Sequence, residues 1–248
     1  MKLLGHRLRV GVVIPSTNTS AQPEMDDLRP FGVTNHVGRM VIADDSLTEE
    51  PGFNSVIQAM RRSTDPAIKS LRDCQLDQLV VAVSPDAYWN GEEMHQQMLD
   101  HLQDTAGGAG ITMSADAIEA ALRSLGGIRR IGLVSPYTEI GDEAVSRFFI
   151  DKGIEIVALS HLGGQSPSRI SEVSSADLRR AVEKANSIHA QAVVQVGTNV
   201  PMAAFAAHAE QWIEKPVIAN NAVLYWHALR KGGVRDQVQG FGSLFSHH

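Results

Sequence analysis

Four short segments gather hydroxyl and amide side chains directly after apolar runs of the kind that form buried strands. They are residues 16–19 (STNT), 84–86 (SPD), 136–138 (PYT) and 197–199 (GTN). Such side chains, together with the backbone N–H groups that open a helix, can hold a carboxylate without a full positive charge. Each of them taken singly also suits a helix N-cap. Together they favour a binding site for a small carboxylic acid, because ligands of open α/β sheets lie beyond the strand ends.

Proton transfer or nucleophilic attack would have to start from Ser84 and its neighbours. An unassisted serine hydroxyl is neither a good nucleophile nor a good base at neutral pH, so Ser84 needs a basic partner. Asp86 and His95 are the two candidates nearby in the sequence. A carboxylate at Asp86, beside the ligand, could take a proton from the substrate or activate a water molecule. The alternative role of Asp86 is an N-cap for the helix that follows.

The remaining chemistry-bearing residues indicate neither a metal nor a cofactor. The ten histidines are scattered, and none forms the HxH or HExxH spacing of a metal site. The sequence has no GxGxxG or GxxxxGKS/T motif, which leaves dinucleotide and P-loop sites unsupported. The single cysteine, Cys74, precedes a predicted strand, and we interpret it as a small buried hydrophobic residue.

Composition and charge narrow the class of partner. The 248-residue chain has a formal net charge of -6, with acidic and basic residues spread along it. A protein that binds nucleic acid or a membrane surface usually concentrates Lys and Arg, so we expect neither partner. No apolar run approaches the roughly 20 residues that cross a bilayer. Residues 1–9 lack the apolar stretch of a signal peptide. We therefore expect a soluble, cytoplasmic protein.

Alternating strands and helices position these candidate residues. Runs rich in Val and Ile predict buried parallel strands at residues 10–14, 79–83, 131–134 and 193–196. Amphipathic stretches predict helices at residues 54–70, 92–103, 115–125, 142–151, 176–190, 203–213 and 222–231. This alternation is typical of an α/β fold whose parallel strands are joined by right-handed crossovers.

The two halves of the sequence repeat each other. Residues 9–18 (RVGVVIPSTN) align without a gap with residues 130–139 (RIGLVSPYTE), and residues 79–86 (LVVAVSPD) align with residues 192–199 (AVVQVGTN). Parallel strands share some likeness anyway, but packing does not require the polar triplet after the strand. We predict two pseudo-symmetric α/β halves, residues 1–110 and 111–219, each a parallel sheet flanked by helices, with the site in the cleft between them. Residues 220–248 are expected to close back on the first half.

Three segments carry a resemblance to a known family. They are residues 10–25 (VGVVIPSTNTSAQPEM), residues 114–139 (SADAIEAALRSLGGIRRIGLVSPYTE) and a C-terminal stretch that includes residues 215–218 (KPVI) and 224–230 (LYWHALR). The sequence resembles the aspartate/glutamate racemase superfamily, in the branch of maleate cis-trans isomerase and arylmalonate decarboxylase. The resemblance covers nearly the whole chain.

The resemblance implies a cofactor-independent isomerase or lyase that acts on a small mono- or dicarboxylic acid, often as a homo-oligomer. With the strand-end pattern, it proposes Asp86, Ser84 and Tyr137 as catalytic residues. The proposed substrate-binding residues are Asn18, Thr19, Thr138, Gly197, Thr198, Asn199 and Asn221.

The sequence departs from this superfamily at its two cysteines. The superfamily uses one cysteine in each half as an acid/base or nucleophile pair, and the decarboxylase type keeps only the second. Here Ser84 occupies the first position and Gly197 the second. Two-base racemisation and addition of a cysteine to maleate therefore have no thiol to use.

Three functions remain open from the sequence. The first is an isomerase or lyase with a cysteine-free variant of the family site. The second is a hydrolase or hydratase in which Asp86 activates water. The third is a protein that binds a carboxylate without catalysis.

Overall fold

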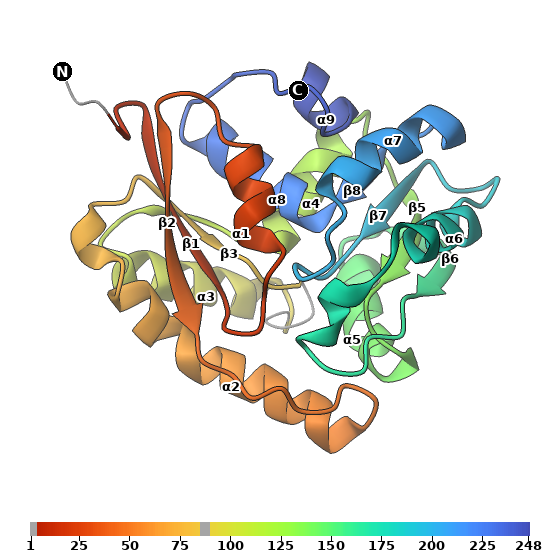
Figure 1. The fold of residues 1–248 in the computed structure, drawn as a ribbon, viewed down its shortest axis with the longest axis horizontal. Helices are drawn as coiled ribbons and strands as arrows, with labels where there is room; N and C mark the ends of the chain where they lie inside the picture. The colour runs from red at the N-terminus through yellow and green to blue at the C-terminus, as the bar shows by residue number, and fades with distance from the viewer. Residues whose placement is uncertain (1–3, 85–89) are drawn as a thin grey trace.

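The computed structural model describes residues 4–84 and 90–248, which form two four-stranded sheets in which every pairing is parallel. The first sheet has the strand order β2-β1-β3-β4 and the second β6-β5-β7-β8, so the same order occurs in each half. This confirms the predicted pseudo-symmetric α/β fold (Figure 1). The strands are β1 (Leu8–Pro15), β2 (Val33–Met40), β3 (Gln78–Val81), β4 (Gly110–Thr112), β5 (Arg130–Ser135), β6 (Glu155–His161), β7 (Ala192–Gln195) and β8 (Val217–Ala219).

Helices flank both sheets and fill the space between them. In Figure 1, α1, α4 and α8 lie between the sheets, whereas α2 runs along one side of the molecule. The helices of the described chain are α1 (Ala21–Asp27), α2 (Glu50–Lys69), α3 (Glu92–Thr105), α4 (Ser114–Ser124), α5 (Glu139–Asp151), α6 (Ser175–Ala185), α7 (Ala203–Ile213), α8 (Asn220–Lys231) and α9 (Ser243–His247).

The four strands expected from the sequence are the two central strands of each sheet. β3 and β7 are buried at every position, and β1 and β5 at all but one, because other strands and helices surround them. The edge strands were not expected. β2 and β6 carry several partly exposed positions, and β4 and β8 are only three residues long.

The expected helices are confirmed, with shifted ends. α2 begins at Glu50, before the expected start, and α6 ends at Ala185. The short helix α1 was not expected. Its start is fixed by Asn18, whose side-chain Oδ1 accepts hydrogen bonds from the backbone N–H groups of Ser20 (3.1 Å) and Ala21 (2.9 Å).

The boundary expected between residues 110 and 111 falls inside β4. β4 pairs with β3, with Gln78 opposite Gly110, so residues 111 and 112 belong to the first sheet. The helix α8 packs against β3, β4 and α1 of the first half, and it also contacts α4 and β8. The rest of the division at 1–110, 111–219 and 220–248 stays a prediction. Within the described residues, no helix is both long and apolar enough to span a bilayer.

Candidate functional site

A pocket lies at the carboxyl ends of the central strands, with lining residues from both halves. The residues that follow β1, β3, β5 and β7 meet there because the carboxyl edges of the two sheets face one another. From these strand ends, the residues that line it are Pro15, Thr17, Asn18, Ser84, Tyr137, Gly197, Thr198 and Asn199. We call four of them, Asn18, Ser84, Tyr137 and Thr198, the polar floor.

Asn18 and Thr198 join the two halves of the polar floor. The Asn18 Nδ2 donates to Thr198 Oγ1 at 3.0 Å, and the Thr198 hydroxyl donates to the carbonyl of Ala82 at 3.0 Å. Both side chains are buried. The described residues take one hydrogen of the Asn18 amide, so the second can serve a ligand.

The side chain of Asn199 forms hydrogen bonds within the protein, including bonds that connect the two halves. Its Oδ1 accepts from the backbone N–H of Thr19 at 2.9 Å. Its Nδ2 donates to the carbonyl of Pro167 at 2.8 Å and to that of Thr17 at 3.4 Å. Both amide hydrogens of Asn199 are donated to the protein, so Asn199 stabilises the wall of the pocket and has no free side-chain donor to offer a ligand.

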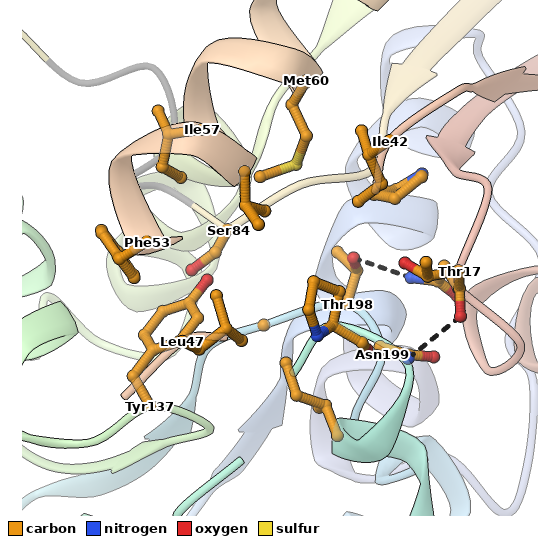
Figure 2. A pocket seen from close by; sticks show the side chains of 16 residues that line it. Thr17, Ile42, Leu47, Phe53, Ile57, Met60, Ser84, Tyr137, Thr198 and Asn199 are labelled. Atoms are coloured by element: carbon orange, nitrogen blue, oxygen red, sulfur yellow. Dashed lines mark hydrogen bonds between the residues drawn. The ribbon is translucent and has the colours of Figure 1, made fainter. Parts of the chain in front are cut away.

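Ser84 and Tyr137 face the same space. The Ser84 Oγ is buried and has no hydrogen-bond partner among the described residues. The Tyr137 ring packs edge-on against Phe53 of α2, with ring centroids 5.4 Å apart. In Figure 2 the Tyr137 hydroxyl points toward Ser84. A buried hydroxyl without a protein partner is costly unless something else satisfies it, so Ser84 is a candidate ligand contact.

The other predicted site residues lie elsewhere. Asp86 falls outside the described residues, so its expected role stays a prediction. Thr19 is exposed, and Thr138 sits at the N-cap position of α5 with its Oγ1 buried and unpartnered within the described chain. Asn221 lies on α8, where its Nδ2 donates to the carbonyl of Thr198 at 2.9 Å. None of Thr19, Thr138 and Asn221 is among the lining residues of the pocket.

An apolar wall faces the polar floor, and the sequence reading did not assign it to the site. Phe53, Val56, Ile57 and Met60 project from one face of α2, at the spacing of neighbouring helical turns. Figure 2 shows Phe53, Ile57 and Met60 across the pocket from Thr198. The complete apolar wall consists of Ile42, Leu47, Phe53, Val56, Ile57, Met60 and Ile170.

Two loops join to close this wall. The loop before α2 meets the segment after β6, where the Leu47 N–H donates to the carbonyl of Gln165 at 2.8 Å. The Asp44 carboxylate accepts from the Ser168 backbone N–H at 2.8 Å and from the Ser168 hydroxyl. Burial opposes ionisation of Asp44, but these hydrogen bonds hold the pKa of its carboxyl below the usual value. The contact places Leu47 and Ile170 against the same cavity.

The lining of the pocket is electrically neutral. Among the described residues that line it, none is Lys, Arg, His, Asp or Glu. An anion placed in this pocket would meet only neutral donors and backbone N–H groups among the described residues, and the expected carboxylate site stays a prediction. In the described part of the chain, no group of three or more His, Cys, Asp or Glu side chains is arranged to hold a metal ion.

Comparison with known families decides the lineage. The model of the arylmalonate decarboxylase family matches residues 10–245. The chain belongs to the arylmalonate decarboxylase family. This confirms the resemblance to that branch of the aspartate/glutamate racemase superfamily. A comparison with curated proteins gives no significant match.

Solved structures similar to this arylmalonate decarboxylase family member share its fold at low sequence identity. The maleate isomerase Iso of Pseudomonas putida S16 has 22% identity and a TM-score of 0.85, over 97% of this chain and 98% of that chain. The TRIS-bound maleate cis-trans isomerase of Nocardia farcinica has 20% identity and a TM-score of 0.85, over 96% and 98%. Unliganded arylmalonate decarboxylase has 16% identity and a TM-score of 0.74, over 97% and 100%.

The backbone at Gly197, which the resemblance places at the second superfamily cysteine position, disfavours any side chain with a Cβ. Gly197 has a φ of +93°, a conformation that side chains with a Cβ rarely adopt. A Cβ added there would lie 2.5 Å from the Cγ of Pro136. A cysteine at this position would require Pro136 or the loop to move.

Two histidines and the cysteine, His95, His227 and Cys74, lie apart from the pocket. His95 does not bond to Ser84 but has its Nε2 3.0 Å from Asp116 Oδ1. Burial lowers the pKa of His227 to about 4, and its Nδ1 lies 3.2 Å from Thr112 Oγ1. Cys74 precedes β3 at the sheet edge opposite the pocket. It is partly exposed, so the expectation of a buried Cys74 is wrong.

Proposed function

We propose that the protein is a cofactor-independent decarboxylase of a small carboxylic acid that carries an apolar group. The observation that carries the proposal is the uncharged pocket, in which a polar floor of hydroxyl and amide groups faces an apolar wall. In this proposal Asn18, Thr198, Ser84 and Tyr137 contact the substrate. Asn199 and Asn221 hold the floor in place, and Thr19 and Thr138 play a structural part.

The apolar wall favours a substrate that carries an apolar substituent beside its carboxyl groups over one, such as maleate, that has carboxylates alone. Maleate has no apolar group, so with one carboxylate on the polar floor its other charge would lie against Phe53, Ile57 and Met60 and stay there, whereas an arylmalonate can place its apolar group against them and lose the second carboxylate as CO₂. Removing an ionised carboxylate from water without a paired cation is strongly unfavourable. A phenyl or alkyl group in the same place gains about 25 cal/mol for each Å² of apolar surface that it buries.

Decarboxylation is also the reaction that these groups can support without a thiol. The C–C bond to one carboxyl group breaks and CO₂ leaves. The electron pair stays on the α-carbon and on the oxygens of the remaining carboxyl group. Donors of the polar floor, aimed at those oxygens, stabilise the developing charge. A proton from the Tyr137 phenol then completes the product, and solvent returns a proton to the phenol. An apolar surrounding for the departing carboxylate favours its loss as neutral CO₂.

Isomerisation by covalent addition makes a heavier demand on this site. It needs a nucleophile that attacks a carbon–carbon double bond, and the hydroxyl of Ser84 has no basic partner among the described residues. Asp86 remains a proposed general base from its place in the sequence. The hydrolase hypothesis depends on Asp86 alone, as the base that would activate water. Because none of the relatives above is named as a hydrolase either, we do not propose this function.

A second candidate is a protein that binds such acids without turning them over. Gly197 favours it, because the backbone at the second superfamily cysteine position leaves no room for a catalytic side chain. Both candidates share the same pocket and the same ligand chemistry. A cytoplasmic location and a homo-oligomeric state, which the sequence suggested, stay predictions.

The test is turnover of phenylmalonate, followed by ¹H NMR in D₂O, with maleate as the comparison. The decarboxylase predicts phenylacetate with one deuterium on the α-carbon and no conversion of maleate. Tyr137→Phe should lower kcat by about 10²- to 10⁴-fold, the usual range for a positioned acid. Ser84→Ala should lower kcat by about 10²- to 10³-fold, the range for loss of one donor to the developing negative charge. Asp86→Asn should lower kcat by the same amount if Asp86 is a base, and leave it unchanged if Asp86 is a cap.

Ser124→Ala is the matched control, since Ser124 is exposed at the end of α4 and the change deletes the same hydroxyl. It should leave kcat unchanged. Tight binding of phenylmalonate without product would favour the binding protein over the enzyme. Faster conversion of maleate than of phenylmalonate would overturn the proposed substrate class, and equal activity of all variants would move the site elsewhere.

A further inference from the structure

A carboxylate on α1, that of Glu24, contacts two elements from distant parts of the chain, α7 and α8. Glu24 is partly buried, and its Oε1 accepts from the backbone N–H of Ala203, at the start of α7, at 2.7 Å. Its Oε2 accepts from Asn221 Nδ2 on α8, also at 2.7 Å. Glu24 does not line the pocket, and the proposed reaction does not use it.

Asn221 connects this carboxylate to the polar floor. Its side chain is buried, and its Nδ2 donates both to Glu24 and to the backbone carbonyl of Thr198 at 2.9 Å. The Asn221 Oδ1 is buried without a hydrogen-bond partner in the described part of the chain. Both amide hydrogens of Asn221 are therefore donated, to Glu24 and to Thr198, while the amide oxygen has no partner within the described residues.

The ionised form of Glu24 dictates this orientation of the Asn221 amide. A carboxylate can only accept hydrogen bonds, so it requires the NH₂ group of Asn221 to face it. A protonated Glu24 has one donor O–H, which cannot face the fixed N–H of Ala203 and must therefore sit on Oε2. The amide then has to turn over so that Asn221 Oδ1 accepts this hydrogen. Turning over withdraws Nδ2 from the carbonyl of Thr198.

We propose that Glu24 is a positioning residue that sets the polar floor through Asn221, so that uptake of one proton at Glu24 releases Thr198 and weakens binding of a carboxylate ligand. The proposal rests on the proposed function, because the ligand occupies the same pocket. Thr198 transmits the change directly, since its hydroxyl receives the Asn18 amide and holds the Ala82 carbonyl.

The surroundings of Glu24 place this proton uptake near neutral pH. Burial raises the pKa of Glu24 to about 7, against the hydrogen bonds from Asn221 and Ala203, and with a smaller contribution from Asp27 on the same helix. At the start of α7, the carboxylate of Glu24 accepts hydrogen bonds from the backbone N–H groups of Met202 and Ala203. The charged and titratable side chains of the packed neighbours β2 and α8 form hydrogen bonds with groups other than Glu24. On β2, Arg39 bonds to Asn18 and Gln22, and His36 bonds to Thr34. On α8, His227 bonds to Thr112, Lys231 to Ile111, and Arg230 to Val234, Asp236 and His248.

The experiment measures the Kd of phenylacetate against pH for the wild type and three variants. Phenylacetate stays ionised throughout the range, so the protein alone supplies any pH dependence. The wild-type Kd should rise about fivefold or more between about pH 8 and about pH 6, since one linked proton changes affinity at most about tenfold per pH unit. Glu24→Gln reproduces the protonated arrangement, because its NH₂ group donates to Asn221 Oδ1. It should therefore give a flat profile at the weak, low-pH affinity.

Asn221→Ala should also give a flat, weak profile, because the link to Thr198 is gone. Asp27→Asn is the matched control on the same helix. It removes a neighbouring charge, leaves the contact intact, and should keep the pH dependence with its midpoint moved slightly lower. A steep profile in Glu24→Gln, or a flat one in the wild type, would overturn the proposal.

A second readout separates this proposal from the proposed function. In the ligand-free protein, the side-chain NH₂ resonances of Asn221 should titrate with a midpoint near neutral pH in the wild type, and should not move in Glu24→Gln. If phenylacetate binds to no variant, the proposed function fails, yet this titration still supports the Glu24 link. If the resonances do not titrate, the Glu24 proposal fails whether or not phenylacetate binds.

Discussion

Replacing Asn199 by alanine removes the side chain that ties the two halves together beneath the pocket. The change deletes the acceptor of the Thr19 N–H and the donor to the Pro167 carbonyl. Only the second of these bonds is buried, and Thr19 itself is exposed. If Asn199 is a brace, this loss acts on the ligand-free protein. If Asn199 instead served only a ligand, the ligand-free protein would keep its stability.

The size of the effect follows from the two bonds. Leaving the buried carbonyl of Pro167 unpaired costs about 1–3 kcal/mol, whereas the Thr19 N–H can return to water, so its bond contributes about 0.5–1.5 kcal/mol. Together they lower the free energy of unfolding by roughly 2–4 kcal/mol. For a chain of 248 residues, each kcal/mol moves the melting temperature by about 2–4 °C, so we expect a fall of about 5–15 °C.

Calorimetry and urea denaturation of the ligand-free protein measure this change directly. Asn54→Ala is the matched control, because Asn54 is exposed on α2 and undergoes the same chemical change. The control should stay within about 0.5 kcal/mol of the wild type, as surface substitutions usually do. A stability for Asn199→Ala within about 1 kcal/mol of the control would show that the hydrogen bonds of Asn199 are not a brace.

Two further substitutions test the local structure and the absence of thiol chemistry. Gly197→Ala should lower the free energy of unfolding by about 1–3 kcal/mol, since it combines a positive φ with a clash against Pro136. Urea denaturation measures this loss, and the matched Gly127→Ala, at a position with a positive φ but no clash, separates the two causes. Equal losses in the two variants would show that the clash with Pro136 contributes nothing. Cys74→Ala should leave phenylmalonate turnover or binding unchanged, as should iodoacetamide treatment of the wild type; a loss beyond about tenfold, or about 1.4 kcal/mol, in a folded protein would show that a thiol takes part.

The sequence alone was enough to predict the central strands and the positions of the polar floor. β1, β3, β5 and β7 are surrounded on all sides, so their apolar runs are nearly continuous and easy to recognise. The edge strands escaped notice because they are half-exposed, as in β2 and β6, or very short, as in β4 and β8. The polar segments follow the central strands directly, which is why Asn18, Ser84, Tyr137 and Thr198 were identified in advance.

What those residues do was decided by contacts between segments far apart in the chain. The apolar stripe of α2 is visible in the sequence, but a helical stripe reads the same whether it faces a core or a cavity. Asn199 has the same side chain as Asn18, yet its partners at Thr17, Thr19 and Pro167 use both of its amide hydrogens. The role of Glu24 could not be predicted from the sequence because its partners, Ala203 and Asn221, are nearly two hundred residues away in the chain.

Strand ends and family motifs consist of residues that are neighbours in the chain, so the sequence alone was enough to determine the central strands and the family. Hydrogen-bond partners, burial and the φ of Gly197 depend on which segments pack together. Only the tertiary structure could therefore divide the predicted site residues into those that face the cavity and those that hold it in shape.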